Sequence, residues 1–545
     1  MKILVKNGSI IDGTGSQRFR ADLLIENGNI SKVGSNLEMN DCEIIDAEGK
    51  IISPGFIDMH HHGDLTILEV NKAEAAIMQG VTTIVVGMCG IGLAPANNKV
   101  RHFYAKFVTK LFGKEDMELH DTLSDYMKKI NEKGVSCNLA FFIPQGNVRA
   151  CVAGNEDRRI TETEMAEMKD IVRKGMEDGA FGLSTGLIYP PGIITPKEEI
   201  IELCKTVKEY SGIYDSHMRN EGTGVIDIGM QELKEIAKKA DIQAQISHWK
   251  AGSNFAWKLT PDMIDFVKNA RENGLNIHAD MYPYEEGSTS LSGALLRPWV
   301  YENFKKNLTD SKTRERIINE TLEMFFTTFL SDLPWYVKII PKFIMKRLMF
   351  WFAKKNARVI SVIHHHEVEG KFLGQALDML YPGEKFEDAL LDFIRDEEGA
   401  IMISFKQMSE EKSILELIKQ DFVCIGSDGF FVLEGNNHPR AHGCFAKILG
   451  NYVREKKLFT LQEAIRKMTG LPASILGLKD RGIIKEGYKA DLVIFDPDTI
   501  QATSTYSNGR QYPKGIEYVI VNGKITVQEG NHLGILNGSI LKKNQ

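Results

Sequence analysis

The sequence predicts an α/β fold, in which a (β/α)8 barrel carries an inserted helical subdomain and a small β-sandwich domain built from both termini. Three observations predict it. The 545 residues exceed what a single compact core usually holds. Short apolar runs alternate with helical stretches through the middle of the chain, and residue types suited to metal or polar binding follow six of the eight runs. Because barrel active sites lie at the C-terminal ends of the strands, this recurrence favours a barrel over an open sheet.

Both ends of the chain have the pattern of β-hairpins. Apolar runs precede Asn-Gly pairs at residues 7–8 and 27–28, and again at 522–523. Asn-Gly favours the tight two-residue turn of a hairpin. Neither end alone offers enough strands for a stable sheet, so we expect residues 1–54 and 476–545 to form one small β domain.

The barrel is expected over residues 55–475. Its candidate strands end at residues 57–62, 83–87, 138–143, 182–185, 213–217, 243–248, 276–280 and 423–428. The gap between the last two strands is too long for an ordinary crossover. It predicts an insertion over residues 296–398 that covers the active site. The run at 400–405 also resembles a strand, but it has no place among the eight.

Charge and cysteine content narrow the classes of partner. The 67 basic and 73 acidic residues give a net charge of −6, without the cationic field that nucleic-acid binding needs. The seven cysteines are odd in number and scattered, which is typical of reduced thiols. Charge and a turn interrupt the first residues before a secretory apolar region could form. We therefore expect a cytoplasmic protein that acts on small molecules.

Histidines at the end of the first barrel strand suggest a metal site. Strand alternation sends His60 and His62 to one side and His61 to the other. Two imidazoles on one strand form a good chelating pair. Cys89 follows the second strand between glycines, which would let the backbone bend and aim a thiolate at the barrel axis.

Three further candidate ligands end later strands. His217 ends the fifth strand, His248 the sixth and Asp428 the eighth. One such residue alone would more often be structural, but six at matching positions indicate a metal centre. A mixed shell of sulfur and imidazole suits Zn²⁺, whereas Mg²⁺ or Ca²⁺ would need mostly oxygen ligands.

The order of these motifs resembles the amidohydrolase superfamily, with paired histidines on the first strand, histidines on the fifth and sixth, and aspartate on the eighth. The fourth strand lacks the lysine that dihydropyrimidinase-like members carboxylate to bridge two metals. Cys89 instead resembles the bridging thiolate of the N-acyl-D-amino-acid deacylases. Further motifs similar to that branch are Leu183–Tyr189, Asp280–Tyr284, Gly287–Thr289 and His438–Gly443.

The resemblance implies zinc-dependent hydrolysis of the amide bond of N-acyl-D-amino acids. A tightly bound zinc would use Cys89, His217 and His248. A second, weaker site would use His60, His62, Cys89 and Asp428. Asp428 would also act as general base and acid. The residues matching positions that bind the substrate carboxylate are Lys250, Tyr282, Ser288 and Arg440, with Tyr189 beside them; His278 is either a support for the ligands or a structural histidine.

The chain departs from these relatives in three places. Residues 335–355 are apolar, aromatic and basic; we interpret them either as a lid or dimer contact, or as a peripheral contact with the inner membrane surface that admits long acyl chains or lipidated substrates. Glu285 and Glu286 are expected to be solvated. The triple His364–His366 is expected to be exposed, with a weak accessory metal site as the alternative.

Two other functions stay open from the sequence. A cyclic-amide hydrolase of the hydantoinase or dihydroorotase kind is disfavoured by Cys89 and by the missing lysine on the fourth strand. A membrane-associated binding protein that has lost catalysis is disfavoured by the complete set of ligands, because such a protein would not need Asp428.

Overall fold

The structure, a computed structural model, describes residues 2–106, 117–154, 156–329 and 341–543. Eight parallel strands form its central sheet. In spatial order they are β8 (Phe56–Asp58), β9 (Val81–Val86), β10 (Asn138–Pro144), β11 (Gly182–Gly186), β12 (Ile213–His217), β13 (Gln243–Ile246), β14 (Ile277–Met281) and β18 (Val423–Ile425). A parallel bridge between His61 and Gly429 joins the last strand to the first. The sheet is nearly closed, and the predicted barrel is confirmed.

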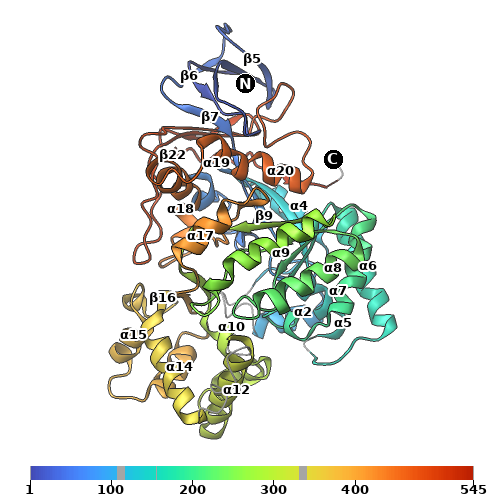
Figure 1. Cartoon of the computed structure of the whole chain (residues 1–545), viewed down its shortest axis with the longest axis vertical. Coiled ribbons are helices and arrows are strands. Elements are labelled where there is room, and N and C mark those ends of the chain that lie inside the picture. Colours follow the sequence, from blue (N-terminus) through green and yellow to red (C-terminus); the bar gives the residue numbers. More distant parts are fainter. Residues whose placement is uncertain (1, 107–116, 155, 330–340, 544–545) are drawn as a thin grey trace.

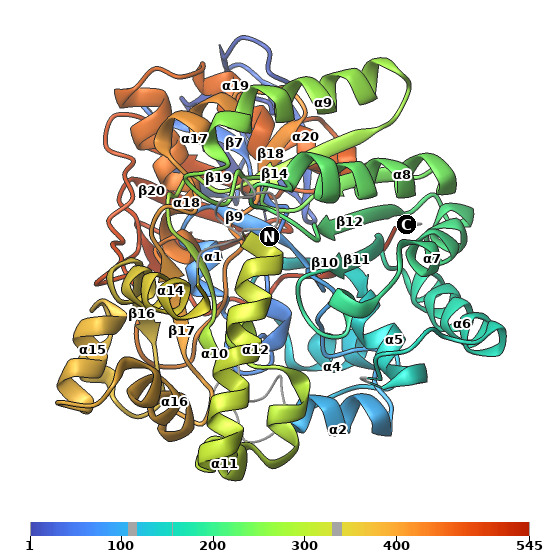
Figure 2. The same cartoon turned by 60° about the horizontal axis from the view of Figure 1, so that its bottom comes forward.

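Six of the eight barrel strands are buried along their whole length, and Gln243 and His278 are the partly exposed residues of the other two, as expected for strands between a filled interior and an outer ring of helices. Every residue of β9 and β10 is buried. Helices α6 (Glu162–Asp178), α7 (Lys197–Glu209) and α8 (Gln231–Ala240) lie outside the barrel (Figures 1 and 2). Helix α6 begins with a capping box between Thr161 and Glu164, which satisfies backbone N–H groups that the first turn leaves free.

Strands from both ends of the chain pair in one sheet. Its order is β22 (Asn531–His532), β21 (Lys524–Gln528), β20 (Ile516–Val521), β19 (Leu492–Phe495), β7 (Ile51–Pro54), β2 (Ser9–Ile10) and β3 (Phe19–Arg20). A second sheet contains β5 (Asn29–Gly34), β4 (Asp22–Glu26), β1 (Lys2–Lys6) and β6 (Glu43–Asp46). Apolar residues of the two sheets share one core, and both termini lie at this end of the molecule (Figure 1). This pairing supports the division we propose, with residues 1–54 and 476–545 in one domain and 55–475 in the other, although β23 (Ile540–Leu541) pairs with β10 of the barrel.

Two of the three predicted Asn-Gly hairpins are confirmed. Asn27 and Gly28 join β4 to β5, and Asn522 and Gly523 join β20 to β21, all four with positive φ. The prediction is wrong for residues 7–8, which connect strands of two different sheets. The local turn is similar, because Asn7 has φ 64°, but the strands that it joins pair elsewhere.

Residues 287–405, between β14 and β18, form a separate lobe, at the bottom of Figure 1. Its helices are α10 (Leu291–Leu295), α11 (Phe304–Asn307), α12 (Ser311–Phe329), α14 (Lys342–Asn356), α15 (Leu373–Leu380) and α16 (Phe386–Asp396). A three-stranded antiparallel sheet accompanies them, in the order β15 (Gly287–Ser290), β17 (Met402–Phe405) and β16 (Ala357–Ser361). The unplaced run at 400–405 is therefore the central strand of this sheet. Among the described helices, none is long and apolar enough to cross a lipid bilayer.

The expectation for Glu286 is wrong, whereas Glu285 is exposed as expected. Glu286 is buried, its carboxylate lies 3.4 Å from the guanidinium of Arg358 on β16, and it accepts a hydrogen bond from Ser404 on β17. Both partners lie far away in sequence. The small sheet brings them to Glu286 and so links the inserted lobe to the strand that carries Ser288.

Candidate metal centre

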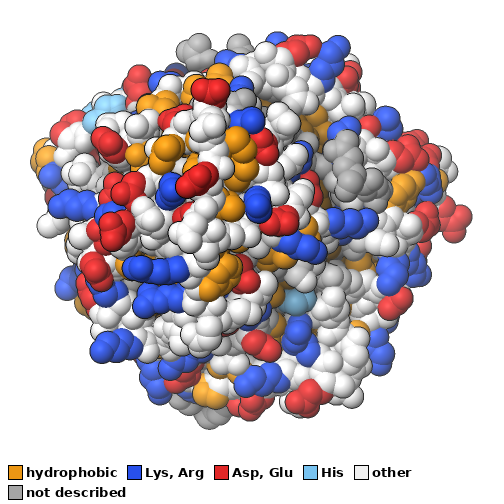
Figure 3. Space-filling model, turned by 90° about the horizontal axis from the view of Figure 1, so that it is seen from above, with side chains coloured by type: hydrophobic (Ala, Val, Ile, Leu, Met, Phe, Trp, Pro, Cys, Tyr) orange, Lys and Arg blue, Asp and Glu red, His pale blue; other side chains and the backbone are white. Residues whose placement is uncertain are grey.

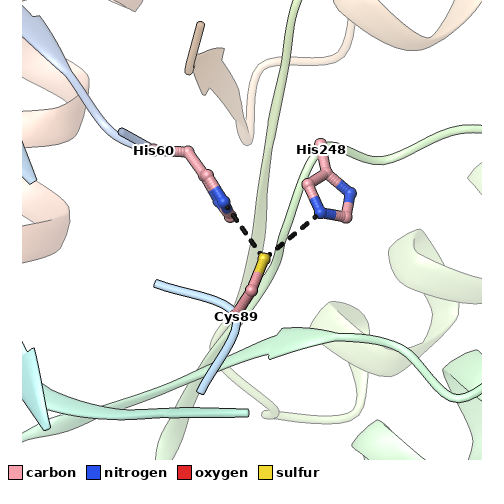
Figure 4. Close-up of side chains that lie close together, drawn as sticks. All are labelled: His60, Cys89 and His248. Carbon is pink, nitrogen blue, oxygen red and sulfur yellow. Dashed lines mark hydrogen bonds between the residues drawn. The ribbon is translucent and has the colours of Figure 1, made fainter. Parts of the chain in front are cut away.

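Six predicted ligands meet at the C-terminal end of the barrel, and the side chain of Cys89 lies at their centre. Its sulfur is 3.4 Å from His60 Nε2, 3.5 Å from His217 Nδ1 and 3.7 Å from His248 Nε2. Figure 4 shows the rings of His60 and His248 both pointing at this sulfur. All four side chains are buried. Sulfur and three ring nitrogens thus converge on one small volume.

The backbone at Cys89 is bent in the way that the glycines predicted. Cys89 itself has φ 53°, and the adjacent Gly90 has φ 69°. A side chain at Gly87, φ 76°, would place its Cβ 2.2 Å from the carbonyl oxygen of Phe142 on β10. Glycine is therefore required where this turn passes the neighbouring strand.

Asp428 and His62 complete the cluster. His62 Nε2 lies 3.3 Å from Asp428 Oδ1, and His60 Nε2 lies 3.8 Å from the same oxygen. The other carboxylate oxygen, Oδ2, is 2.8 Å from Arg440 Nη1. Asp428 also has a positive φ of 52°, and its N–H donates to the carbonyl of His60 at 2.8 Å. The carboxylate thus lies between the metal cluster and a buried guanidinium.

The electrostatics favour ionised ligands. Burial alone would raise the pKa of the Cys89 thiol, but the charge of His60 and hydrogen bonds from His217 and His248 hold this pKa well below its ordinary value. Burial would likewise raise the pKa of Asp428, yet Arg440 and His62 keep it well below its usual range. A thiolate and a carboxylate persist here at neutral pH because positive charge surrounds them.

The donor set fits a metal ion of the zinc type. His60, Cys89 and His248 offer atoms within 4.8 Å of one another, as do His60, His62 and Asp428. Thiolate and imidazole together suit Zn²⁺ better than oxygen-seeking Mg²⁺ or Ca²⁺. His60 belongs to both groups, so the two potential sites are contiguous.

Two carboxylates contact the ring nitrogens of the ligand histidines, and sequence reasoning did not identify them. Glu221 Oε1 lies 3.0 Å from His248 Nδ1, and Glu221 Oε2 lies 3.7 Å from His217 Nε2. On another side, Asp280 Oδ1 lies 3.7 Å from His60 Nδ1 and accepts the N–H of His248 at 2.8 Å. A carboxylate behind a ligating imidazole fixes its orientation and tautomer. In the sequence, the one available sign that Glu221 supports a ligand was its position four residues after His217.

The residues predicted to bind the substrate carboxylate lie around the same cluster. Lys250 Nζ is 2.8 Å from both Glu221 Oε1 and His248 Nδ1. The guanidinium of Arg440 lies 4.7 Å from the ring centroid of Tyr282, and its Nη2 donates to the carbonyl of Ser288 at 3.4 Å.

Tyr189 lies on the side of His217, with the two ring centroids 5.1 Å apart, and its hydroxyl lies 3.2 Å from Thr289 Oγ1. All five predicted substrate-binding side chains therefore border the metal cluster or its immediate partners.

Two other sets of histidines lie apart from the cluster. His278 Nε2 is 2.8 Å from Asn276 Oδ1, and burial lowers the pKa of its imidazole to about 4. The structural interpretation of His278 fits these contacts. His364 and His366 are exposed as expected, while the ring of His365 contacts Glu397 at 2.6 Å. Within the described residues, the clusters able to hold a metal do not include this triple.

A cavity of about 310 Å³ opens beside His62. Its apolar lining comes from the barrel side, through Leu65 and residues 430–433, and from the inserted lobe, through Ile360, Val362 and Ile363. Ser288 and His62 border it as well. A larger cavity, about 590 Å³, is lined by residues of α2 (Asn98–Lys106) and α6 and by neighbouring segments, among which are no predicted ligands.

Residues 389–527 match the amidohydrolase family, the family that the histidines, cysteine and aspartate at the strand ends resemble. Over nearly its whole length the chain is similar to the D-aminoacylase of Alcaligenes xylosoxydans xylosoxydans. The two are 28% identical over 541 residues, which cover 99% of this chain and 97% of the relative. The resemblance to the N-acyl-D-amino-acid deacylases is therefore confirmed.

Solved structures agree with this relationship. A D-aminoacylase studied for its binuclear metal centre superposes with a TM-score of 0.79 at 27% identity, covering 99% of both chains. The N-acyl-D-glutamate deacylase of Bordetella bronchiseptica, in complex with zinc and a phosphonate that mimics the tetrahedral intermediate, gives a TM-score of 0.80 at 27% identity, again over 99% of both chains. The chain therefore shares the overall fold of these two enzymes.

Glu221→Gln should weaken metal binding about 10- to 100-fold, because the neutral amide no longer orients His217 and His248. The measurement is retention of zinc against a graded chelator, with the metal read directly. Glu209→Gln, at an exposed position on α7, is the matched control and should retain zinc like the parent chain. Equal retention by both variants would show that Glu221 does not support the ligands.

Proposed function

We propose that the chain is a metal-dependent amidohydrolase that cleaves the linear amide bond of N-acyl-D-amino acids, releasing a carboxylic acid and a free amino acid. The observation that carries the proposal is the meeting of Cys89, His60, His217 and His248 around one point, with Asp428 between them and Arg440. The D-aminoacylase and deacylase relatives supply the reaction. They favour neither a cyclic-amide hydrolase nor an inactive binding protein.

The proposed cofactor is zinc. Cys89, His217 and His248 would hold one ion tightly, and His60, His62, Cys89 and Asp428 would form a second, weaker site. When bound, zinc supplies a Lewis acid that polarises the scissile carbonyl. The low pKa of the Cys89 thiol supports this assignment, because a thiolate is the form that binds metal.

Asp428 is the proposed general base and acid. Its carboxylate is ionised, buried and within 4 Å of two predicted ligands, so it can take the proton of an attacking water at Oδ1 and return it to the leaving amine. Arg440 holds the opposite oxygen. The ion pair therefore fixes which oxygen of the carboxylate faces the reaction.

The proposed carboxylate-binding site consists of Lys250, Tyr282, Ser288 and Arg440, bordered by Tyr189. Two of its members carry fixed positive charge, and a guanidinium can hold a carboxylate through two hydrogen bonds. Burial of this site strengthens each of these interactions relative to water.

Asp428→Asn should lower kcat about 10²- to 10⁴-fold, the usual contribution of general acid–base catalysis. The chain should stay folded, since the amide is isosteric and the backbone bond to His60 is unchanged. Turnover of an N-acyl-D-amino acid is measured at matched zinc content. Normal turnover by a fully loaded Asp428→Asn variant would remove the catalytic assignment.

Arg440→Ala should raise KM for N-acyl amino acids about tenfold or more, because a charge-assisted hydrogen bond to the substrate is lost. Arg440→Lys keeps the charge but not the planar fork, so its KM should lie between those of Arg440→Ala and the parent. Both variants are compared on substrates with a free and an amidated carboxyl group. An equal rise in KM for the two kinds of substrate would argue against carboxylate binding.

The cavity beside His62 extends the proposal to long acyl chains. Its walls are mostly apolar, and one wall comes from the inserted lobe, which we propose covers the active site over residues 296–398. Ile363 lines it from a segment whose N–H donates to the buried carboxylate of Glu397 at 2.9 Å. A change of side chain at this position leaves that backbone bond intact.

Ile363→Trp should lower kcat/KM for N-decanoyl substrates about tenfold, because the larger side chain would exclude part of the acyl chain from the cavity. The factor corresponds to two methylene groups that are no longer buried, at about 0.8 kcal/mol each. N-acetyl substrates should change less than about twofold. Val100→Ile, a conservative change in the buried core outside this cavity, serves as the control for general packing effects. If the decrease in kcat/KM depended on the size of the amino-acid side chain and not on the length of the acyl chain, the cavity would be the pocket for the side chain.

The proposed location is the cytoplasm, with peripheral contact between the inner membrane surface and residues 335–355. Residues 335–340 of that segment lie outside the described residues. The remainder belongs almost entirely to α14.

A further inference from the structure

Helix α14 presents a stripe of large apolar side chains to solvent. The exposed fractions are 66% for Phe343, 39% for Ile344, 50% for Leu348 and 56% for Trp351. At about 100° per residue these four side chains fall within an arc of about 140° on the helix. Scattered exposed apolar residues are ordinary, but four on one face of one helix mark an interaction surface.

The opposite face of α14 is already fixed to the inserted lobe. Met345 and Phe350 are buried, and the Phe350 ring lies 5.2 Å from that of Phe386 on α16. Lys346 pairs with Glu387, also on α16, at 3.1 Å. The helix therefore has one face packed on its own chain and another face left to solvent, and its orientation does not depend on a partner.

The charge on α14 has a single sign. Its fifteen residues, KFIMKRLMFWFAKKN, include five basic residues and no acidic one, in a chain whose net charge is −6. Arg347 and Lys355 are exposed within the same arc as the stripe, and Lys355 Nζ lies 4.7 Å from the ring centroid of Trp351. On the face shown in Figure 3, by contrast, acidic and basic side chains are intermixed. The exposed surface of α14 thus combines large apolar side chains with long cationic ones.

We propose that this face of α14 docks the protein on a bilayer of anionic lipid. A helix that lies in a membrane interface buries apolar and aromatic side chains, while the long side chains of Lys and Arg reach from the same surface to negatively charged headgroups. A second copy of the chain fits the surface less well. A two-fold contact through α14 would bring Arg347 and Lys355 close to the same cations of the partner.

Docking through α14 would also bring the active site close to substrates dissolved in the membrane. This step rests on the proposed function. The helix continues directly into β16, whose residues Ile360 and Ser361 line the cavity beside His62. An N-acyl substrate with a long chain concentrates in a bilayer. A cavity whose wall is joined to the docking helix would then take such substrates from the membrane surface.

The test is flotation of the zinc-loaded full-length protein with vesicles of phosphatidylcholine, with and without phosphatidylglycerol. The parent chain should float with the anionic vesicles and lose this binding at high salt. Leu348→Ser/Trp351→Ser should lower the partition coefficient at least about tenfold. The matched control is Phe19→Ser/Leu533→Ser, at exposed apolar residues of the terminal domain, and it should float like the parent.

A charge-reversal variant tests the lipid chemistry. Arg347→Glu/Lys355→Glu should lose binding to anionic vesicles about tenfold or more while keeping the apolar stripe. Three outcomes would overturn the proposal: no flotation of the parent chain, equal flotation of the apolar variant and its control, or loss of a stable dimer in the apolar variant by light scattering. Hydrolysis of a soluble N-acetyl substrate should be unchanged in all variants. Failure of docking is therefore distinguishable from failure of the proposed function.

Discussion

Closure of eight parallel strands is the constraint on which the site depends. The six predicted ligands come from the ends of five strands or from the residues just beyond them, and these ends converge only if the sheet curves back on itself. The closing contacts are part of the site: Ser427, next to Asp428, donates its N–H to Asp58 Oδ1 at 2.7 Å, and Asp58 also accepts the N–H of His60 at 3.3 Å. One buried carboxylate therefore joins the first and last strands at the ligands.

The sequence predicted the ligands because their signal is local. His60 and His62 follow a short apolar run and lie on one side of a strand, and the glycines around Cys89 mark a sharp bend. Residues that end parallel strands of a barrel all lie at the same end of it. Glu221 and Asp280 support the same histidines but gave no comparable signal, because a carboxylate near a strand end is ordinary. Their role depends on where loops place them after the barrel has closed.

Long-range pairing explains the expectations that were wrong. Glu286 was expected in solvent, and it is buried because Arg358 and Ser404 arrive on two strands distant in sequence.

For α14, composition indicated an apolar and basic segment, but the phase of the helix decides whether its apolar residues face the core or solvent. Since Met345 and Phe350 occupy the buried face, Leu348 and Trp351 are left outside. The sequence could predict that the segment would be apolar and basic, but not which of its side chains would face solvent.

Three of the six ligand positions are held in a backbone conformation that L-residues rarely adopt. Cys89, His248 and Asp428 have φ values of 53°, 35° and 52°, and such residues each cost about 1–3 kcal/mol unless their surroundings impose the conformation. The surroundings do so here. The N–H of Asp428 donates to His60, that of His248 donates to Asp280, and that of Gly90, beside Cys89, donates to Ser184 at 3.1 Å. Every one of these acceptors lies on, or directly after, another barrel strand. The strain is therefore offset by the same closure that assembles the ligands, and a change that loosens the barrel should displace the ligands before it unfolds the chain.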